Sequence, residues 1–352
     1  MTHPARLARA QRLVREAEGH DLRLVCDPAP EKGPATLRTA RAAWAAVEPG
    51  ATHHLVVTDD TVFGPGFLDH VERAVRRRPH QALVFFTEWG SRTASALRIA
   101  ALCGRPWTEV VDFYLPDLAL VMPAEVARGF DDYAASLPED TLSDHVLHDH
   151  LARAGMTALV SVPNLVDHAD VPSLIQHEQM GLRPSACFTP ELAAAGVPEG
   201  DPLTGLTTVP FFSWWNLQAE CFVRDDGTSS EWRKEQLAVV LARRGLTAAD
   251  DDGDGPFASA VGRLEHLSGL LSRSLLRTLW LTAYGVGLIA AERSSEIDMT
   301  SAAARTSLRS LAPGGLRRII DPQASPQAYE LLNAFVESAV RSGVEGRERV
   351  SS

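Results

Sequence analysis

The spacing of apolar and polar residues predicts strands separated by amphipathic helices over the first two hundred residues. Short apolar runs with strand character occur at residues 21–26, 55–57, 82–86, 118–122 and 157–162. Helical periodicity occurs between and around them, at residues 4–18, 34–47, 65–77, 124–135 and 142–154. Strands alternating with helices at this spacing predict an α/β domain whose mainly parallel sheet is flanked by helices on both faces.

The pattern changes after Phe188. Residues 189–215 carry repeated Gly and Pro together with TTVPFFSWW, and helical periodicity follows at residues 231–244, 257–293 and 326–342. No strand pattern of comparable strength is found there. We therefore expect three segments: an α/β domain over residues 1–200, an aromatic, Gly- and Pro-rich connector over residues 201–230, and a mostly helical region over residues 231–352.

The helical region carries a broad apolar stripe. It is formed by Leu264, Leu267, Leu271, Leu275 and Leu279. A stripe of this width is not left in water, so we expect it to pack in a helical bundle, on the sheet domain or on a second subunit of a homo-oligomer. The apolar run at residues 275–291 is short for a membrane span and is interrupted by Arg277, so a buried helix is expected in place of a membrane span.

Composition narrows the class of protein. The chain has 352 residues, of which 45% are hydrophobic and 22% charged, and this is sufficient for a substantial core. A net charge of −11 argues against a nucleic acid or an anionic membrane as partner. The four cysteines form no CxxC pair and there is no secretory signal, which favours reduced thiols in the cytoplasm.

An acidic pair directly follows the second predicted strand, in the stretch HHLVVTDDTVFGPGF at residues 53–67. Ligands of open α/β sheets bind outside the carboxyl ends of the strands, where Asp59 and Asp60 are expected to lie. Carboxylate oxygens are suitable ligands for a hard divalent cation. The alternative is that the pair caps the helix that follows, because Asp is a good N-cap.

A second acidic pair, Glu139 and Asp140, precedes a helix in the stretch LPEDTLSDHVLHDH at residues 137–150. Its simplest role is to stabilise the positive end of the helix dipole, although one acid would suffice as a cap. On the same helix, Asp144 and His148 have the i,i+4 spacing that a metal can bridge, while alternating acids and imidazoles are also typical of a solvated face.

His168 follows the strand at residues 157–162, in a predicted loop with acids on both sides. A single loop histidine is usually a surface residue. Here it comes third in an ordered set, after an acidic pair that follows a strand and an acidic pair that precedes a helix.

This order, VVTDD, then PED before a helix, then VPNLVDH followed by VPSL, resembles glycosyltransferases of the GT-A fold, close to the inverting family-2-like and family-25-like bacterial enzymes. The resemblance covers roughly residues 2–188. It implies a Rossmann-like nucleotide-sugar-binding domain. Family members open with a strand, so the resemblance also predicts a Val/Ile-rich strand encoded upstream of Met1, or N-terminal residues that pair in a shortened form.

The resemblance implies a role for each candidate residue. Asp60 and His168 are expected to hold Mn²⁺ or Mg²⁺ on the diphosphate of the donor. Asp59, with Thr61 beside it, is expected to contact the donor, and Asp27 the base or ribose of its nucleotide. Asp140 is expected to be the general base, with Glu139 as the second acid of its motif.

The implied reaction transfers a sugar from a nucleoside-diphosphate sugar to a hydroxyl acceptor, with inversion. The bound cation neutralises charge on the leaving diphosphate, and a carboxylate takes the proton of the acceptor hydroxyl. The main alternative is a catalytically silent binding or scaffold protein with the same sheet. A metal-dependent phosphoryl or nucleotidyl transferase is less favoured, because the sequence has no P-loop or Gly-rich phosphate cradle.

Overall fold

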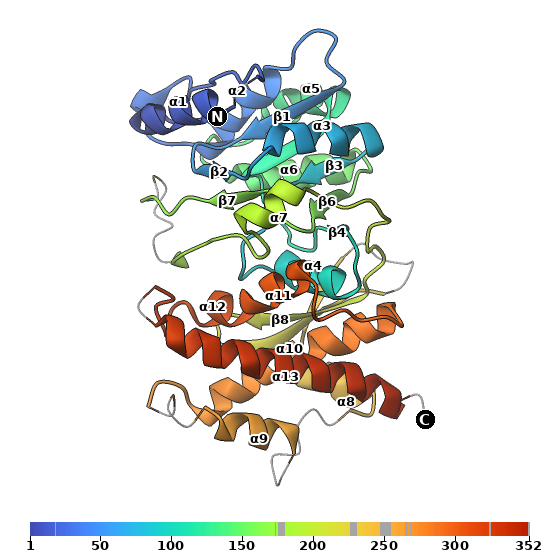
Figure 1. Ribbon diagram of the computed structural model, residues 1–352. Helices are drawn as coiled ribbons and strands as arrows, with labels where there is room; N and C mark the ends of the chain where they lie inside the picture. The colour runs from blue at the N-terminus through green and yellow to red at the C-terminus, as the bar shows by residue number, and fades with distance from the viewer. Residues whose placement is uncertain are drawn as a thin grey trace. The chain divides into compact units, whose positions relative to one another are not determined.

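The computed structural model describes residues 1–17, 19–172, 174, 180–225, 231–246, 255–264, 267, 269–323 and 325–350. It divides into two compact units (Figure 1). The first comprises Met1–Glu88 and Asp112–Glu199, and the second Trp89–Val111 and Gly200–Ser352. The chain therefore leaves the first unit after its third strand and returns to it. The end of the predicted connector, residues 226–230, lies outside the described residues.

The first unit contains strands and helices close to those that the sequence pattern predicts. In chain order they are η1 (Pro4–Arg6), α1 (Leu7–Glu16), η2 (Pro30–Lys32), α2 (Thr36–Ala45), β1 (His53–Val57), β2 (Thr61–Phe63), α3 (Phe67–Arg77), β3 (Ala82–Val84), β5 (Ala119–Pro123), α5 (Ala124–Ala134), α6 (Ser143–Arg153), β6 (Ala158–Ser161), β7 (Val166–His168) and α7 (Pro190–Ala195). Its class is α/β, with a sheet flanked by helices, as expected.

The sheet of this unit is mixed, so the expectation of a mainly parallel sheet is wrong. Its strands lie in the order β1-β5-β3-β6. β5 is antiparallel to both β1 and β3, whereas β3 and β6 are parallel. The cause is the path of the chain, because β5 is entered from residues 112–118 and not from a crossover helix packed on the sheet, which a parallel connection requires.

Helices α2, α5 and α6 pack against one another beside β1 and β5. Trp44 of α2 is buried there, with ring centroids 5.6 Å from His54 of β1 and 6.5 Å from Phe130 of α5. His54 Nε2 also contacts the carbonyl oxygen of Ala43 at 2.9 Å. These contacts fix the end of α2 against the start of β1, and the opposite ends of the two elements contribute to the candidate site.

Two local predictions are corrected. Residues 21–26 form no strand: their pairing is limited to one parallel bridge between Cys26 and Thr2, in which the N–H of Thr2 donates to the carbonyl oxygen of Val25 at 2.9 Å. His168 lies in a strand and not in a loop, because β7 pairs antiparallel with β2 and places Thr61 opposite His168.

The second unit contains both helices and strands. They are α4 (Arg92–Leu102), β4 (Trp107–Glu109), β8 (Thr208–Ser213), β9 (Gln218–Val223), β10 (Arg233–Gln236), α8 (Leu237–Arg243), α9 (Pro256–Gly262), α10 (Arg273–Arg293), α11 (Ala302–Arg309), α12 (Leu311–Leu316) and α13 (Pro326–Val350). Strands β10, β9 and β8 form an antiparallel sheet, so the expectation that no comparable strand follows Phe188 is wrong. The C-terminal region is mostly helical, as expected. The aromatic run that appeared to be a connector forms β8, since aromatic residues fit a pleated surface.

Helices α10 and α13 lie side by side in this unit (Figure 1). A Cβ on Gly287 of α10 would collide with the backbone of Val340 of α13, and one on Gly343 would collide with the backbone of Tyr284. The absence of both side chains is what allows the helix axes to approach so closely. Leu264, Leu267, Leu271 and Leu279 of the predicted stripe are buried within the chain.

Among the described residues, α10 is the one helix long and apolar enough to cross a membrane by length and composition. However, 72% of its most apolar window is buried inside the protein. The prediction of a buried core helix is confirmed.

Candidate functional site

A cavity of about 430 Å³ in the first unit brings together several of the candidate residues. It opens where β1 ends and where β5, α2 and α6 begin. Its wall includes Asp59, Asp60 and His168, the basic residues Arg6 and Arg183, and the carboxylates of Asp117 and Asp144.

The direction of β5 brings the acids to one edge of the sheet. β1 ends at Val57 and its partner β5 begins at Ala119, and the N–H of Thr58 donates to the carbonyl oxygen of Leu118 at 3.0 Å. Asp117, which precedes an antiparallel strand, therefore lies at the same edge as Asp59, which follows β1.

The pairing of β2 with β7 brings His168 to the acidic pair. Because Thr61 is opposite His168, the preceding residue Asp60 comes within reach, and its Oδ2 lies 3.4 Å from His168 Nε2. Burial acts to raise the pKa of Asp60, but His168, the Thr58 hydroxyl at 2.5 Å and the nearby Arg6 outweigh it. They hold the pKa of Asp60 well below its usual range, so this carboxyl stays ionised.

Two guanidinium groups lie beside this pair. Arg6 Nη1 is 3.1 Å from Asp59 Oδ1 and 3.5 Å from Asp60 Oδ2. Arg183 Nη2 is 3.2 Å from His168 Nε2. The same nitrogen of His168 thus faces both a cation and a carboxylate, and which one it engages depends on its protonation. Both arginines place positive charge where a phosphate group would need it.

The Asp60 and His168 pair fits a divalent cation that takes its other ligands from elsewhere. An oxygen and a nitrogen 3.4 Å apart can both reach one ion, and Mg²⁺ commonly keeps water and substrate phosphates as its remaining ligands. Within the described part of the chain, no group of three or more His, Cys, Asp or Glu side chains is arranged to hold a metal. A metal here would therefore depend on oxygens that the protein does not supply.

Asp117 has the electrostatic character of a proton acceptor. Burial, followed by the negative charges of Asp144 and Asp60, raises the pKa of Asp117 to about 7. Ser143 at the start of α6 donates to its Oδ2 at 3.3 Å and moderates that shift. A carboxyl with a pKa near 7 in a cavity can take up a proton and release it near neutral pH.

Asp27 and Thr61 are occupied by the protein itself. Both carboxylate oxygens of Asp27 lie 2.7 Å from the guanidinium of Arg38, which lowers the pKa of Asp27, and the side chain is fully buried. Thr61 is buried and donates to the carbonyl oxygen of Leu118 at 3.1 Å. Asp27 lies in the cavity wall, whereas Thr61 does not.

The structure does not place Glu139 or Asp140 in the wall of this cavity. Glu139 pairs with Arg38 at 3.0 Å and with Lys32 at 3.7 Å. Arg38 is the main cause of its lowered pKa. Asp140 is exposed on the loop before α6. The acid that α6 directs into the cavity is Asp144, one turn further along the chain.

Sequence reasoning therefore missed Asp117 and the basic residues Arg6 and Arg183. The signal for Asp117 was available, since it directly precedes a predicted strand, but its position at this edge depends on the direction of that strand. The arginines had no comparable signal, because each reaches the cavity through pairing between distant segments.

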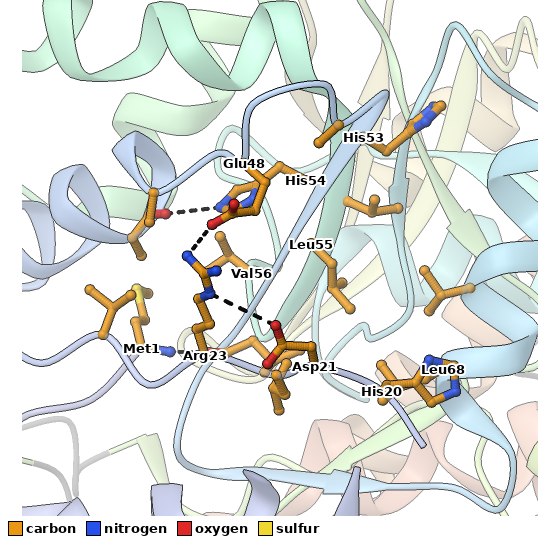
Figure 2. A pocket seen from close by; sticks show the side chains of 18 of the residues that line it. Met1, His20, Asp21, Arg23, Glu48, His53, His54, Leu55, Val56 and Leu68 are labelled. Atoms are coloured by element: carbon orange, nitrogen blue, oxygen red, sulfur yellow. Dashed lines mark hydrogen bonds and ion pairs between the residues drawn. The ribbon is translucent and has the colours of Figure 1, made fainter. Parts of the chain in front are cut away.

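A second cavity, of about 370 Å³, runs along the outer edge of β1 (Figure 2). The register with β5 turns the backbone groups of His53 and Leu55 away from β5 and toward this cavity. Figure 2 shows Arg23 between Asp21 and Glu48, with which it forms ion pairs. None of the acids that line the first cavity also lines this one.

Comparison of the chain with protein-family models, with curated proteins and with solved structures finds no match. The assignment of a function therefore rests on the geometry of the site.

Proposed function

We propose that this protein is a glycosyltransferase that moves a sugar from a nucleoside-diphosphate sugar to a hydroxyl acceptor. The observation that carries the proposal is the composition of the cavity in the first unit. An ionised carboxylate beside a histidine, two guanidinium groups, and a carboxyl with a pKa near 7 line the same space.

The donor side is the region around Asp60, His168, Arg6 and Arg183. A diphosphate brought there meets two guanidinium groups that can donate to its oxygens. Asp60 and His168 would hold Mn²⁺ or Mg²⁺ against the same diphosphate, and such an ion, when bound, stabilises the charge that develops on the leaving group. The arginines contribute to the same stabilisation through hydrogen bonds.

The acceptor side is the region around Asp117 and Asp144. Asp117 takes the proton of the acceptor hydroxyl as this attacks the anomeric carbon, while burial and the negative charge of Asp144 keep the pKa of Asp117 high enough for the transfer to be efficient. This assigns to Asp117 the role that the sequence resemblance gave to Asp140. Attack from the face opposite the diphosphate inverts the anomeric centre.

Turnover of a nucleotide sugar with two matched variants tests this proposal. The full chain is incubated with UDP-, GDP-, ADP- and dTDP-sugars in the presence of Mn²⁺ or Mg²⁺, and release of the nucleoside diphosphate is measured. Asp117→Asn should lower turnover about 10²-fold or more and leave nucleotide affinity unchanged. Asp140→Asn should retain the wild-type turnover. Loss of turnover in Asp140→Asn alone would return the base to the loop before α6.

The second candidate is a catalytically silent binding protein. Its supporting observation is the pairing of Asp59 with Arg6 and of Asp27 with Arg38, which satisfies these acids inside the protein. Nucleotide binding without turnover of any nucleotide sugar would favour this candidate over the transferase.

A further inference from the structure

An exposed aromatic wall borders the acceptor side of the cavity. Phe113 is 52% exposed although it is a large apolar side chain, and it lies in the cavity wall. Its ring centroid is 5.1 Å from that of His145, with the ring planes inclined by 34°. Tyr114 adds a third ring, 6.0 Å from His145. Exposure of this kind at a cavity marks a surface for a ligand.

The wall and the two carboxylates are held together as one unit. Phe113 and Asp117 belong to the segment that leads into β5, whereas Asp144 and His145 belong to the first turn of α6. The N–H of Leu115 donates to the carbonyl oxygen of Asp144 at 3.0 Å, and Ser143 donates to Asp117 at 3.3 Å. These bonds join the two segments, so the rings and the acids keep a fixed relation before any ligand arrives.

This combination selects among the possible ligands. A phosphate would be repelled by Asp117 and Asp144 and is better received near Arg6 and Arg183. Guanine and the pyrimidine bases present carbonyl oxygens, which would oppose the carboxylates, and adenine presents one exocyclic amino group beside ring nitrogens that only accept. A sugar ring presents an apolar C–H face for an aromatic ring and hydroxyl groups that donate to carboxylates.

We propose that Phe113 and His145, with Asp117 and Asp144, form a subsite for a pyranose ring, so that the acceptor of the transfer is a carbohydrate. The inference rests on the proposed function and adds the chemical class of its acceptor. The apolar face of the ring packs on Phe113, and one of its hydroxyls reaches Asp117. A tyrosine side chain presents a ring face but only one hydroxyl, and a long-chain alcohol presents no ring, whereas a pyranose presents several hydroxyls beside its apolar face and can donate to both Asp117 and Asp144.

The test is binding of a panel of methyl pyranosides, of the gluco, galacto and manno series, to the full chain by saturation-transfer NMR. Phe113→Ala should weaken the binding of those that bind about fivefold or more, and Phe113→Tyr should retain it. Tyr133→Ala is the matched control, because Tyr133 also lies against a histidine, His150, at 5.4 Å, but outside the cavity wall. This control should bind as the wild type does.

A second arm keeps this inference separate from the proposed function. Binding of UDP, GDP, ADP and dTDP with Mn²⁺ is measured by calorimetry on the same proteins. If no pyranoside binds, or if Phe113→Ala binds them unchanged, the sugar subsite is overturned, even where nucleotide binds. If pyranosides bind through Phe113 and no nucleotide binds, the subsite stands as a carbohydrate-binding site and the transferase is overturned.

Discussion

Nε2 of His168 lies 3.4 Å from Oδ2 of Asp60 because the strand that ends in His168 pairs with the strand that begins directly after Asp60. The contact is therefore part of a backbone ribbon and does not depend on a flexible loop. A ligand bound between these two groups would therefore also stabilise the pairing of β2 with β7.

The first prediction concerns a shared metal and nucleotide site. Mn²⁺ with a nucleoside diphosphate should raise the free energy of unfolding by about 2.7 kcal/mol at a hundredfold excess over the dissociation constant, and neither should do so alone. His168→Ala and Asp60→Asn should abolish this synergy, as measured by thermal unfolding. His148→Ala is the control, because His148 pairs with Asp149 outside the cavity.

A nucleotide effect of equal size without any divalent ion would contradict the metal site. Arg6 and Arg183 would then neutralise the diphosphate unaided.

The second prediction concerns the stability cost of Asp117. Its pKa of about 7 in the folded protein is above the ordinary value of 3.8, so the folded state holds the proton more tightly than the unfolded state. Wild-type stability relative to Asp117→Asn should be constant below pH 4, fall as the pH rises to 7, and level off above it. The total change should be on the order of 4 kcal/mol, of which roughly 3 kcal/mol falls between pH 5 and pH 8.

Urea unfolding of both proteins at pH 5 and pH 8 measures this difference. Asp140→Asn, at an exposed position, corrects for general effects of the substitution. If the stability difference between wild type and Asp117→Asn is the same at both pH values, the pKa of Asp117 is not raised in the folded protein.

The third prediction concerns Arg38, which pairs with buried Asp27. Arg38→Met should destabilise the protein by about 3 kcal/mol or more, because it leaves the buried carboxylate of Asp27 without its partner. Arg41→Met removes a pair of the same length, 2.7 Å to Asp131, from a more exposed place and should cost less than about 1 kcal/mol. Chemical denaturation compares the two, and similar losses would mean that burial of Asp27 has little consequence.

The fourth prediction concerns the contact of α10 with α13. Gly287→Ala should destabilise the protein by about 1 to 3 kcal/mol, because the added Cβ meets the backbone around Val340, which cannot turn aside as a side chain can. Gly262→Ala is the control: it lies in α9 with no atom within 4 Å of an added Cβ, and should be neutral or slightly stabilising. A neutral Gly287→Ala in thermal unfolding would show that the helices can move apart freely.

The sequence was sufficient to locate most helices and strands of the first unit, because their apolar periodicity is local. It was not sufficient to predict the direction of β5, which depends on the excursion of residues 89–111 out of the unit. The direction of β5 also determines which acids lie together in the candidate site. Asp60 could be found because it follows a strand, whereas Asp117 precedes one, and only an antiparallel arrangement brings both to the same edge.

The strand β7 was missed for a related reason. Its three residues are too few to show a period, and their identity as a strand depends on β2, which lies far away in the sequence. The position of His168 could thus be predicted as near a sheet edge, but not its contact with Asp60. Asp140 was favoured as a base from its neighbours in sequence, and nothing local distinguishes it from Asp144, which reaches the cavity.

The outer edge of β1 can promote self-association of the protein at high concentration. Its outward backbone groups at His53 and Leu55 face the second cavity and pair with no neighbouring strand in the described part of the chain, and Arg23 and Glu48, which form an ion pair, line the same cavity. Displacement of residues 20–25 would expose a ready template for edge-to-edge pairing between molecules. The rate of self-association in storage should therefore depend on how often residues 20–25 detach from β1. High salt or low pH weakens the ion pair of Arg23 with Glu48 and should promote self-association under conditions in which the protein is still folded.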